Sequence, residues 1–163
     1  MKKAASIFAC TLIILAFAFN NSEAQSIGLT GVGGRLGFVD ASRTNGTIIL
    51  GVHAELGEII ENLALVPSID YFSKHSVSYL SFNGNVRYYF PSSSHIDFFG
   101  GGGLALLRVD LPAGLGSDTS LGLNLLGGAD FPVSDNLIAT AQLIYNTEGD
   151  QIKILGGITY LID

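Results

Sequence analysis

Apolar and polar residues alternate with a period of two along most of the chain, and this pattern constrains the fold more than any other feature. In SYLSFNGNVRYYF, residues 78–90, the even positions from Leu80 onward are apolar or glycine, and the odd positions from Ser81 to Arg87 are polar. Successive side chains of a β-strand point to opposite faces of a sheet. The segment therefore predicts a strand that separates an apolar medium from a polar one.

Eight segments of this kind follow one another, separated by short stretches rich in Gly, Pro, Asn, Asp and Ser, which favour turns. We expect strands at residues 26–40, 47–57, 63–73, 77–90, 95–109, 119–131, 137–147 and 151–162. The first and fifth fit the alternation only with a β-bulge, or leave its phase open. No segment shows a helical period of useful length. The sequence therefore predicts one all-β domain, residues 25–163, with eight antiparallel strands in up-and-down order.

The first 24 residues predict a secretory signal peptide. Lys2 and Lys3 precede an apolar run over residues 4–19, and Ser22-Glu23-Ala24 has small residues where a signal peptidase reads them. The apolar run is shorter than the roughly 20 residues that a membrane-spanning helix needs, and polar residues follow it at once. We therefore expect cleavage before Gln25, which would also remove Cys10 and leave a chain without disulfide or thiol chemistry.

Charge is sparse in the remaining chain. Without Lys2, Lys3 and Glu23 it carries 6 basic and 13 acidic residues, a formal net charge of −7, which argues against a nucleic acid partner. Charged residues usually make up roughly 25–35% of a soluble protein's surface. Here only 19 residues of the whole predicted domain are charged, and the mean hydropathy of the full 163-residue chain is +0.44. An apolar surface facing an apolar environment is the expected result.

The alternation alone is compatible with two kinds of barrel. A soluble barrel would enclose its apolar residues, whereas a membrane barrel would turn them outward and enclose its polar residues. The polar positions hold mostly Ser, Asn, Thr, Gln and Gly with a few isolated charges. Such residues suit a packed polar interior better than a surface facing water, which favours the membrane barrel.

Aromatic residues at the apolar positions favour the same choice. In an up-and-down chain that enters from the periplasm, two groups gather near the two ends of the barrel, while Phe82 lies near mid-strand. The periplasmic group is Tyr88, Phe90, Phe98, Phe131 and Tyr160, and the outer group is Phe38, Tyr71 and Tyr145. Aromatic girdles at both membrane interfaces are typical of transmembrane barrels.

The signal segment, the eight alternating strands, the tight turns that alternate with longer loops and the closing GITYLID resemble the small outer-membrane β-barrel proteins of Gram-negative bacteria. These OmpA/OmpX-type barrels are often grouped as porin-family proteins. The resemblance implies a transmembrane barrel in the outer membrane, surrounded by its lipids and inserted by the barrel-assembly machinery. It also implies an assembly signal in the last strand, where Gly157, Tyr160 and Ile162 fit the family's pattern and Asp163 departs from its usual terminal aromatic.

The interior of an eight-stranded barrel is just wide enough for side chains to fill it. The polar positions place twelve candidates there: Arg35, His53, Glu55, Asp70, Asn83, Asn85, Arg87, Asp97, Asn124, Asp130, Gln142 and Lys153. Glu55, Arg87, Asp97 and Asp130 map to the periplasmic half, where one cation among carboxylates would form a hydrogen-bonded network. We interpret this network as structural packing, with a gate on a narrow water path as the alternative.

Catalytic patterns are weak. His75 and Ser76 are adjacent and so point to opposite faces of an extended strand, Ser78 lacks a matching carboxylate, and His53-x-Glu55 alone indicates neither a metal site nor acid–base chemistry. We expect no catalytic, cofactor or metal site. The sequence thus predicts a structural, non-enzymatic outer-membrane barrel, with slow passage of small solutes as an added role. A secreted soluble ligand-binding barrel is the alternative, and a lipid-A-modifying enzyme the third; ligand and oligomeric state are not predicted.

Overall fold

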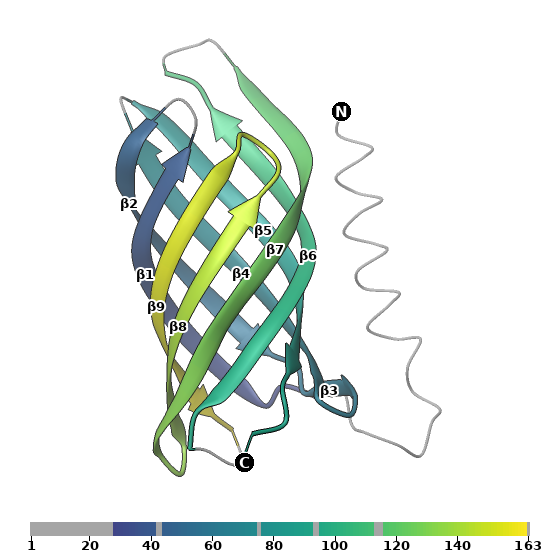
Figure 1. Ribbon diagram of the computed structural model, residues 1–163. Helices are drawn as coiled ribbons and strands as arrows, with labels where there is room; N and C mark the ends of the chain where they lie inside the picture. Colours follow the sequence, from purple (N-terminus) through teal and green to yellow (C-terminus); the bar gives the residue numbers. More distant parts are fainter. Residues whose placement is uncertain (1–27, 42–43, 75, 93–94, 113–115, 163) are drawn as a thin grey trace.

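The computed structural model describes residues 28–41, 44–74, 76–92, 95–112 and 116–162, which form a closed antiparallel β-barrel (Figure 1). The predicted signal peptide, residues 1–24, lies outside the described residues. Eight long strands form the wall: β1 (Gly31–Ala41), β2 (Thr44–Glu55), β4 (Leu63–Lys74), β5 (Val77–Tyr89), β6 (Asp97–Asp110), β7 (Ser117–Ser134), β8 (Leu137–Asn146) and β9 (Gln151–Leu161). Eight antiparallel strands were predicted, and this architecture is confirmed.

The barrel closes because every wall strand pairs with both of its neighbours. Each strand pairs with the next along the chain, and β1 also pairs with β9. The β2–β4 seam is the shortest, since its ladder joins only Ile49–His53 to Ser68–Phe72. We call the end at which the described chain enters β1 and leaves β9 the terminal end, shown at the bottom of Figure 1, and the opposite end the loop end.

The predicted tight turn at residues 58–62 contains a short strand, β3 (Glu58–Ile60), that was not expected. Glu58 pairs with Ala64 and Ile60 with Leu63 at the start of β4. Asn62 turns the chain between them with a φ of 63°, a left-handed conformation that asparagine tolerates better than most residues. The connection is therefore a small hairpin at the terminal end.

Most other strand boundaries also differ from the prediction by a few residues, among them the start of β2, at Thr44 instead of residue 47. Residues 28–30 were expected in the first strand but precede β1. The predicted strand 119–131 extends to Ser134, and its register to β8 shifts between Pro132 and Ser134. Proline has no N–H to give to a ladder, so an irregularity at Pro132 is expected on physical grounds.

No bulge is needed in β6, where the alternation looked ambiguous. Its register to β5 and β7 is continuous. The ambiguity arose because Ala105 and Leu107 are apolar and face inward, with 0% and 5% of their surface exposed. The interior therefore also holds apolar residues that alternation alone does not separate from the outer face.

Several of these inward apolar side chains form a packed cluster that was not predicted. Phe72 stacks against the partly buried Tyr79, with the ring centroids 4.5 Å apart. The buried members of this cluster are Val39, Ile49, Phe72, Phe99, Leu126, Ile144 and Leu155. These apolar side chains fill the part of the barrel interior that the polar side chains do not occupy.

The wall is nevertheless polar inside and apolar outside at most positions. On β9, Lys153 is 1% exposed, whereas its neighbour Ile154 is 62% exposed. Sixteen polar or charged residues are buried among the described residues, and 28 large apolar side chains are exposed. The phase of the alternation is thus the one expected for a membrane barrel. In the described part of the chain, no helix has the length and apolarity to cross a membrane.

Glycine in β6 allows the close approach of β5. A Cβ atom on Gly101 or Gly103 would collide with the carbonyl oxygens of Val86 and Gly84 on the neighbouring strand. The glycine run at residues 100–103 is therefore part of the curved wall, as its position within a predicted strand suggested.

Candidate functional site

The polar interior is the candidate functional site, because the predicted lumen residues lie there. Ten of the twelve are buried: Arg35, His53, Asp70, Asn83, Asn85, Arg87, Asn124, Asp130, Gln142 and Lys153. Glu55 is partly buried and Asp97 is exposed. Their contacts form two charged groups and a row of asparagines that is joined to the first group.

The first group, which we call the Asp70 cluster, consists of Arg35, Ser68, Asp70 and Lys153. Asp70 is 0% exposed and accepts a hydrogen bond from Arg35 Nε over 2.8 Å. Arg35 Nη2 lies 2.6 Å from the same carboxylate oxygen and donates to Ser68 Oγ over 2.7 Å, while Lys153 Nζ lies 3.6 Å from Asp70 Oδ2. Two buried cations thus share one carboxylate, and they reach it from β1 and β9 across to β4.

A row of asparagines extends from this cluster toward the loop end. Asn83 donates to Asp70 Oδ2 over 3.1 Å and accepts from Asn124, whose amide also donates to Asn85 over 2.9 Å. Asn146 in turn donates to Asn124 over 2.6 Å. Because an amide both donates and accepts, such a row satisfies buried polar groups without adding charge.

The second group, the Arg87 cluster, lies nearer the terminal end. Arg87 reaches from β5 to Glu55 on β2 and to Asp130 on β7, with N–O distances of 3.5 and 3.8 Å. Its Nη2 donates to Gln142 Oε1 on β8 over 3.2 Å, and its guanidinium lies 4.5 Å from the centroid of the Phe99 ring. These contacts join β5 to β2, β7 and β8, so the Arg87 side chain fills the cross-section of the barrel at this level.

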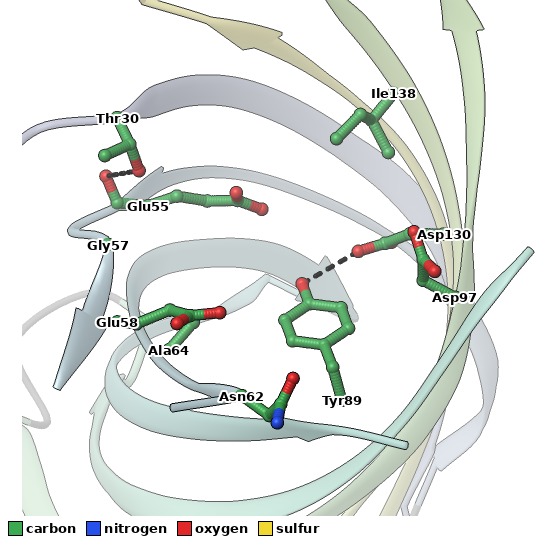
Figure 2. A pocket seen from close by; sticks show the side chains of 10 residues that line it. All are labelled: Thr30, Glu55, Gly57, Glu58, Asn62, Ala64, Tyr89, Asp97, Asp130 and Ile138. Atoms are coloured by element: carbon green, nitrogen blue, oxygen red, sulfur yellow. Dashed lines mark hydrogen bonds between the residues drawn. The ribbon is translucent and has the colours of Figure 1, made fainter. Parts of the chain in front are cut away.

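Below Arg87, a cavity of about 590 Å³ opens at the terminal end (Figure 2). Glu55, Glu58, Asp97 and Asp130 contribute four carboxylates to its lining. Figure 2 shows the Tyr89 hydroxyl pointing to Asp130, to which it donates over 2.9 Å. We call this cavity the acidic vestibule.

The structure brings three of the four predicted network residues together and leaves one apart. Glu55 and Asp130 both pair with Arg87, whereas Asp97 lines the vestibule and is exposed. Asp97 is the first residue of β6, at the barrel rim, which explains its distance from the buried guanidinium.

Sequence reasoning missed other members of this group. Gln142 was predicted in the lumen but not as a partner of Arg87, and the roles of Tyr89, Phe99 and Thr140 were not foreseen. Thr140 donates to Asp130 over 2.6 Å. Tyr89 lies at an odd position of SYLSFNGNVRYYF, so the alternation already placed it on the polar face. Phe99 carried no comparable signal, because an apolar residue was not expected inside.

The predicted girdle aromatics all lie on the outer face. Every one has between 38% and 64% of its surface exposed: Phe38, Tyr71, Tyr145, Tyr88, Phe90, Phe98, Phe131 and Tyr160. Tyr88 and Phe90 contact each other edge to face at 5.5 Å. Their role as membrane-interface girdles stays a prediction.

The three predicted assembly residues lie in or directly after β9. Tyr160 and Ile162 are 55% and 40% exposed, and Ile162 N donates to Thr30 O over 2.8 Å. Gly157 lies next to the interior, where an added Cβ would come within 3.2 Å of Arg35 Cβ. Recognition of these residues by the barrel-assembly machinery stays a prediction.

The residues considered for catalysis do not form a recognisable unit. His53 Nε2 lies 2.8 Å from Thr159 Oγ1, whereas Glu55 contacts Arg87. His75 lies outside the described residues, and Tyr71 Oη lies 3.3 Å from Ser78 Oγ. Within the described ranges, no three His, Cys, Asp or Glu residues are placed to hold a metal ion.

A closed eight-stranded antiparallel barrel with an apolar outer wall and a polar interior is a transmembrane β-barrel fold. Solved structures share it. Neisserial surface protein A matches with a TM-score of 0.69 and 17% identity, over 82% of this chain and 96% of that one. De novo designed transmembrane β-barrels match with a TM-score of 0.57 and 18% identity, over 85% and 98%.

The outer membrane enzyme PagL has the same fold, with a TM-score of 0.51 and 17% identity over 81% of this chain and 99% of PagL. At these identities the likeness concerns the fold alone. No protein-family model and no curated protein sequence matches the chain.

Proposed function

We propose that the protein is a structural, non-enzymatic barrel of the bacterial outer membrane. The observation that carries this proposal is the inverted barrel: among the described residues, 28 large apolar side chains are exposed while sixteen polar or charged residues are buried. Soluble monomers rarely expose continuous apolar patches larger than a few hundred Å². In a bilayer, the same surface faces lipid tails and the closed ladder satisfies the backbone.

The secreted soluble barrel is disfavoured by the same observation. It requires the apolar face of each strand to line a ligand cavity, but Leu36, Leu125 and Ile154 are all more than 60% exposed. The cavity at the terminal end is lined instead by carboxylates. If this barrel were a soluble protein, its apolar outer wall would face water.

Location and partners follow as parts of the proposal. Residues 1–24 would direct export, outer-membrane lipids would cover the apolar wall, and the barrel-assembly machinery would insert the chain through its last strand. The fold itself does not decide against an enzyme, since PagL shares it. We do not propose an enzyme because the His53–Thr159 pair is buried in the interior and His53 Nδ1 has no carboxylate partner among the described residues.

Cell fractionation tests this proposal. When the protein is expressed with residues 1–24 in a Gram-negative host, we expect it in the outer-membrane fraction, resistant to urea washing and released by detergent. Its apolar wall provides the physical reason. Recovery from the periplasm or medium without detergent would contradict the proposal and favour the soluble barrel.

The added role as a narrow channel is limited by the side chains inside. Arg87 and Asp70 are 1% and 0% exposed, and their contacts join strands on different sides of the interior. In a planar bilayer, we therefore expect the purified protein to show no steady ohmic current. A stable open level in the wild-type protein would contradict the closed lumen and restore the channel.

A further inference from the structure

A small cavity lies between the Asp70 and Arg87 clusters. Arg35, His53, Arg87, Thr140 and Gln142 line it, together with Leu155 and Gly157. Its volume is about 10 Å³, which is room for one small particle.

The side chains around this cavity hold buried nitrogen atoms without partners among the described residues. These atoms are Arg35 Nη1, His53 Nδ1, Arg87 Nε and Gln142 Nε2, and each parent residue is at least 94% buried. Only one other buried side-chain atom of the described residues shares this condition, Gln151 Oε1. Four residues that line one cavity each have a buried atom without a partner, and this indicates a ligand because leaving a buried polar group unpaired is costly.

The chemistry of these atoms specifies the ligand. The guanidinium nitrogens of Arg35 and Arg87 only donate hydrogen bonds, and Gln142 uses its oxygen to accept from Arg87, which leaves its amide nitrogen as a donor. No carboxylate lines the cavity. A water molecule accepts about two hydrogen bonds, whereas a monatomic anion accepts from three or more donors at once.

Charge next to the cavity favours an anion as well. The buried ion pairs as a whole hold three cations, Arg35, Arg87 and Lys153, and three carboxylates, Asp70, Asp130 and Glu55. Of these six groups, only the cations Arg35 and Arg87 line the cavity. An anion there would face two buried guanidinium groups and no carboxylate.

We propose that this cavity binds one halide ion, in solution chloride, between Arg35 and Arg87. The ion joins the Asp70 cluster to the Arg87 cluster and so stabilises the closed interior. This site does not depend on the proposed cellular function, since it rests only on the interior of the barrel.

Crystallography with bromide tests the proposal on the wild-type protein. Crystals grown in bromide should show one anomalous peak in the cavity, within hydrogen-bonding reach of Arg35, Arg87 and Gln142. Density for water only, without an anomalous signal, would overturn it. This measurement needs no variant and therefore cannot fail through misfolding.

A matched pair of variants tests the same site in solution. The unfolding temperature should be higher in sodium bromide than in sodium gluconate at equal ionic strength, and the difference should grow with the logarithm of bromide concentration. Gln142→Glu keeps an acceptor for Arg87 but adds a negative charge, so it should abolish this bromide-specific shift. Gln151→Glu makes the same change at a buried residue outside the cavity and should retain it. Equal shifts in both variants would overturn the proposal.

Discussion

Replacing Arg87 with alanine is expected to destabilise the barrel by about 3–5 kcal/mol, because breaking a buried ion pair leaves uncompensated charge. Arg87 is 1% exposed and is the cation that Glu55 and Asp130 share. Its loss also removes the contact with Phe99 and leaves Gln142 Oε1 without its donor. Equilibrium unfolding in urea, with the protein in lipid vesicles, measures the loss.

Arg108 provides a matched control for this substitution. It also pairs with an aspartate, Asp110, at 2.9 Å, but the two side chains are 52% and 44% exposed. Exposed ion pairs contribute little because water screens them. Arg108→Ala should therefore leave the unfolding midpoint almost unchanged. If both variants lose equally little unfolding free energy, Arg87 is solvated and water enters the interior of the barrel.

A second control separates charge from packing. If uncompensated carboxylates cause most of the loss, adding Glu55→Gln and Asp130→Asn to Arg87→Ala should restore part of the stability. A cavity left by the missing side chain would not be relieved by these two changes. A triple variant as unstable as Arg87→Ala would assign the loss to packing.

The barrel architecture could be predicted from the sequence because alternation is a local property that repeats in every strand. A residue such as Asn83 or Lys153 takes its side of the wall from its neighbours in the chain, so no knowledge of distant contacts was needed. The alternation predicted the strands less accurately where other physical constraints act on the backbone. Pro132 shifted a register, and a turn with Asn62 folded into the small hairpin that contains β3.

The partners inside the barrel could not be predicted in the same way. Alternation shows that Asp70 and Arg87 face inward, but it does not show how far along the barrel axis each side chain lies or which partners it contacts. These depend on strand tilt and stagger, which bring Arg35 of β1 and Lys153 of β9 to Asp70 of β4. Asp97 was assigned to the network from its sequence phase, although it lies at the rim. Phe99 was missed because an inverted barrel still needs apolar side chains to fill gaps between polar ones.

Replacing Phe82 with arginine is expected to cost about 2–4 kcal/mol, the range for a cation near the midplane on the lipid face of a barrel. Phe82 lies near the middle of β5 and is 40% exposed on the outer wall. Tyr88, on the same face of the strand and 41% exposed, lies close to the terminal end. There the same substitution should cost only about 0–1 kcal/mol, because the side chain reaches the interface.

The difference between these two positions is the informative quantity. It is measured as the difference in unfolding free energy of Phe82→Arg and Tyr88→Arg in lipid vesicles. A soluble barrel with the structure described would have both side chains in water, where arginine costs little at either position. Equal, small losses would therefore contradict the membrane environment while leaving the fold intact.

Asn83 adds the opposite face of the same strand to this comparison. It is 5% exposed, donates to Asp70 and accepts from Asn124, so Asn83→Leu should cost about 1–3 kcal/mol through unpaired polar groups. This loss should not depend on lipid, because the interior is closed in detergent and in bilayers alike. The Phe82→Arg penalty should instead change with bilayer thickness, since a thinner bilayer brings Phe82 closer to an interface. The loss for Phe82→Arg should therefore depend on the lipid, whereas the loss for Asn83→Leu should not. This is the result expected of a single-layered β-barrel wall, because neighbouring residues of one strand face lipid on one side and the polar interior on the other.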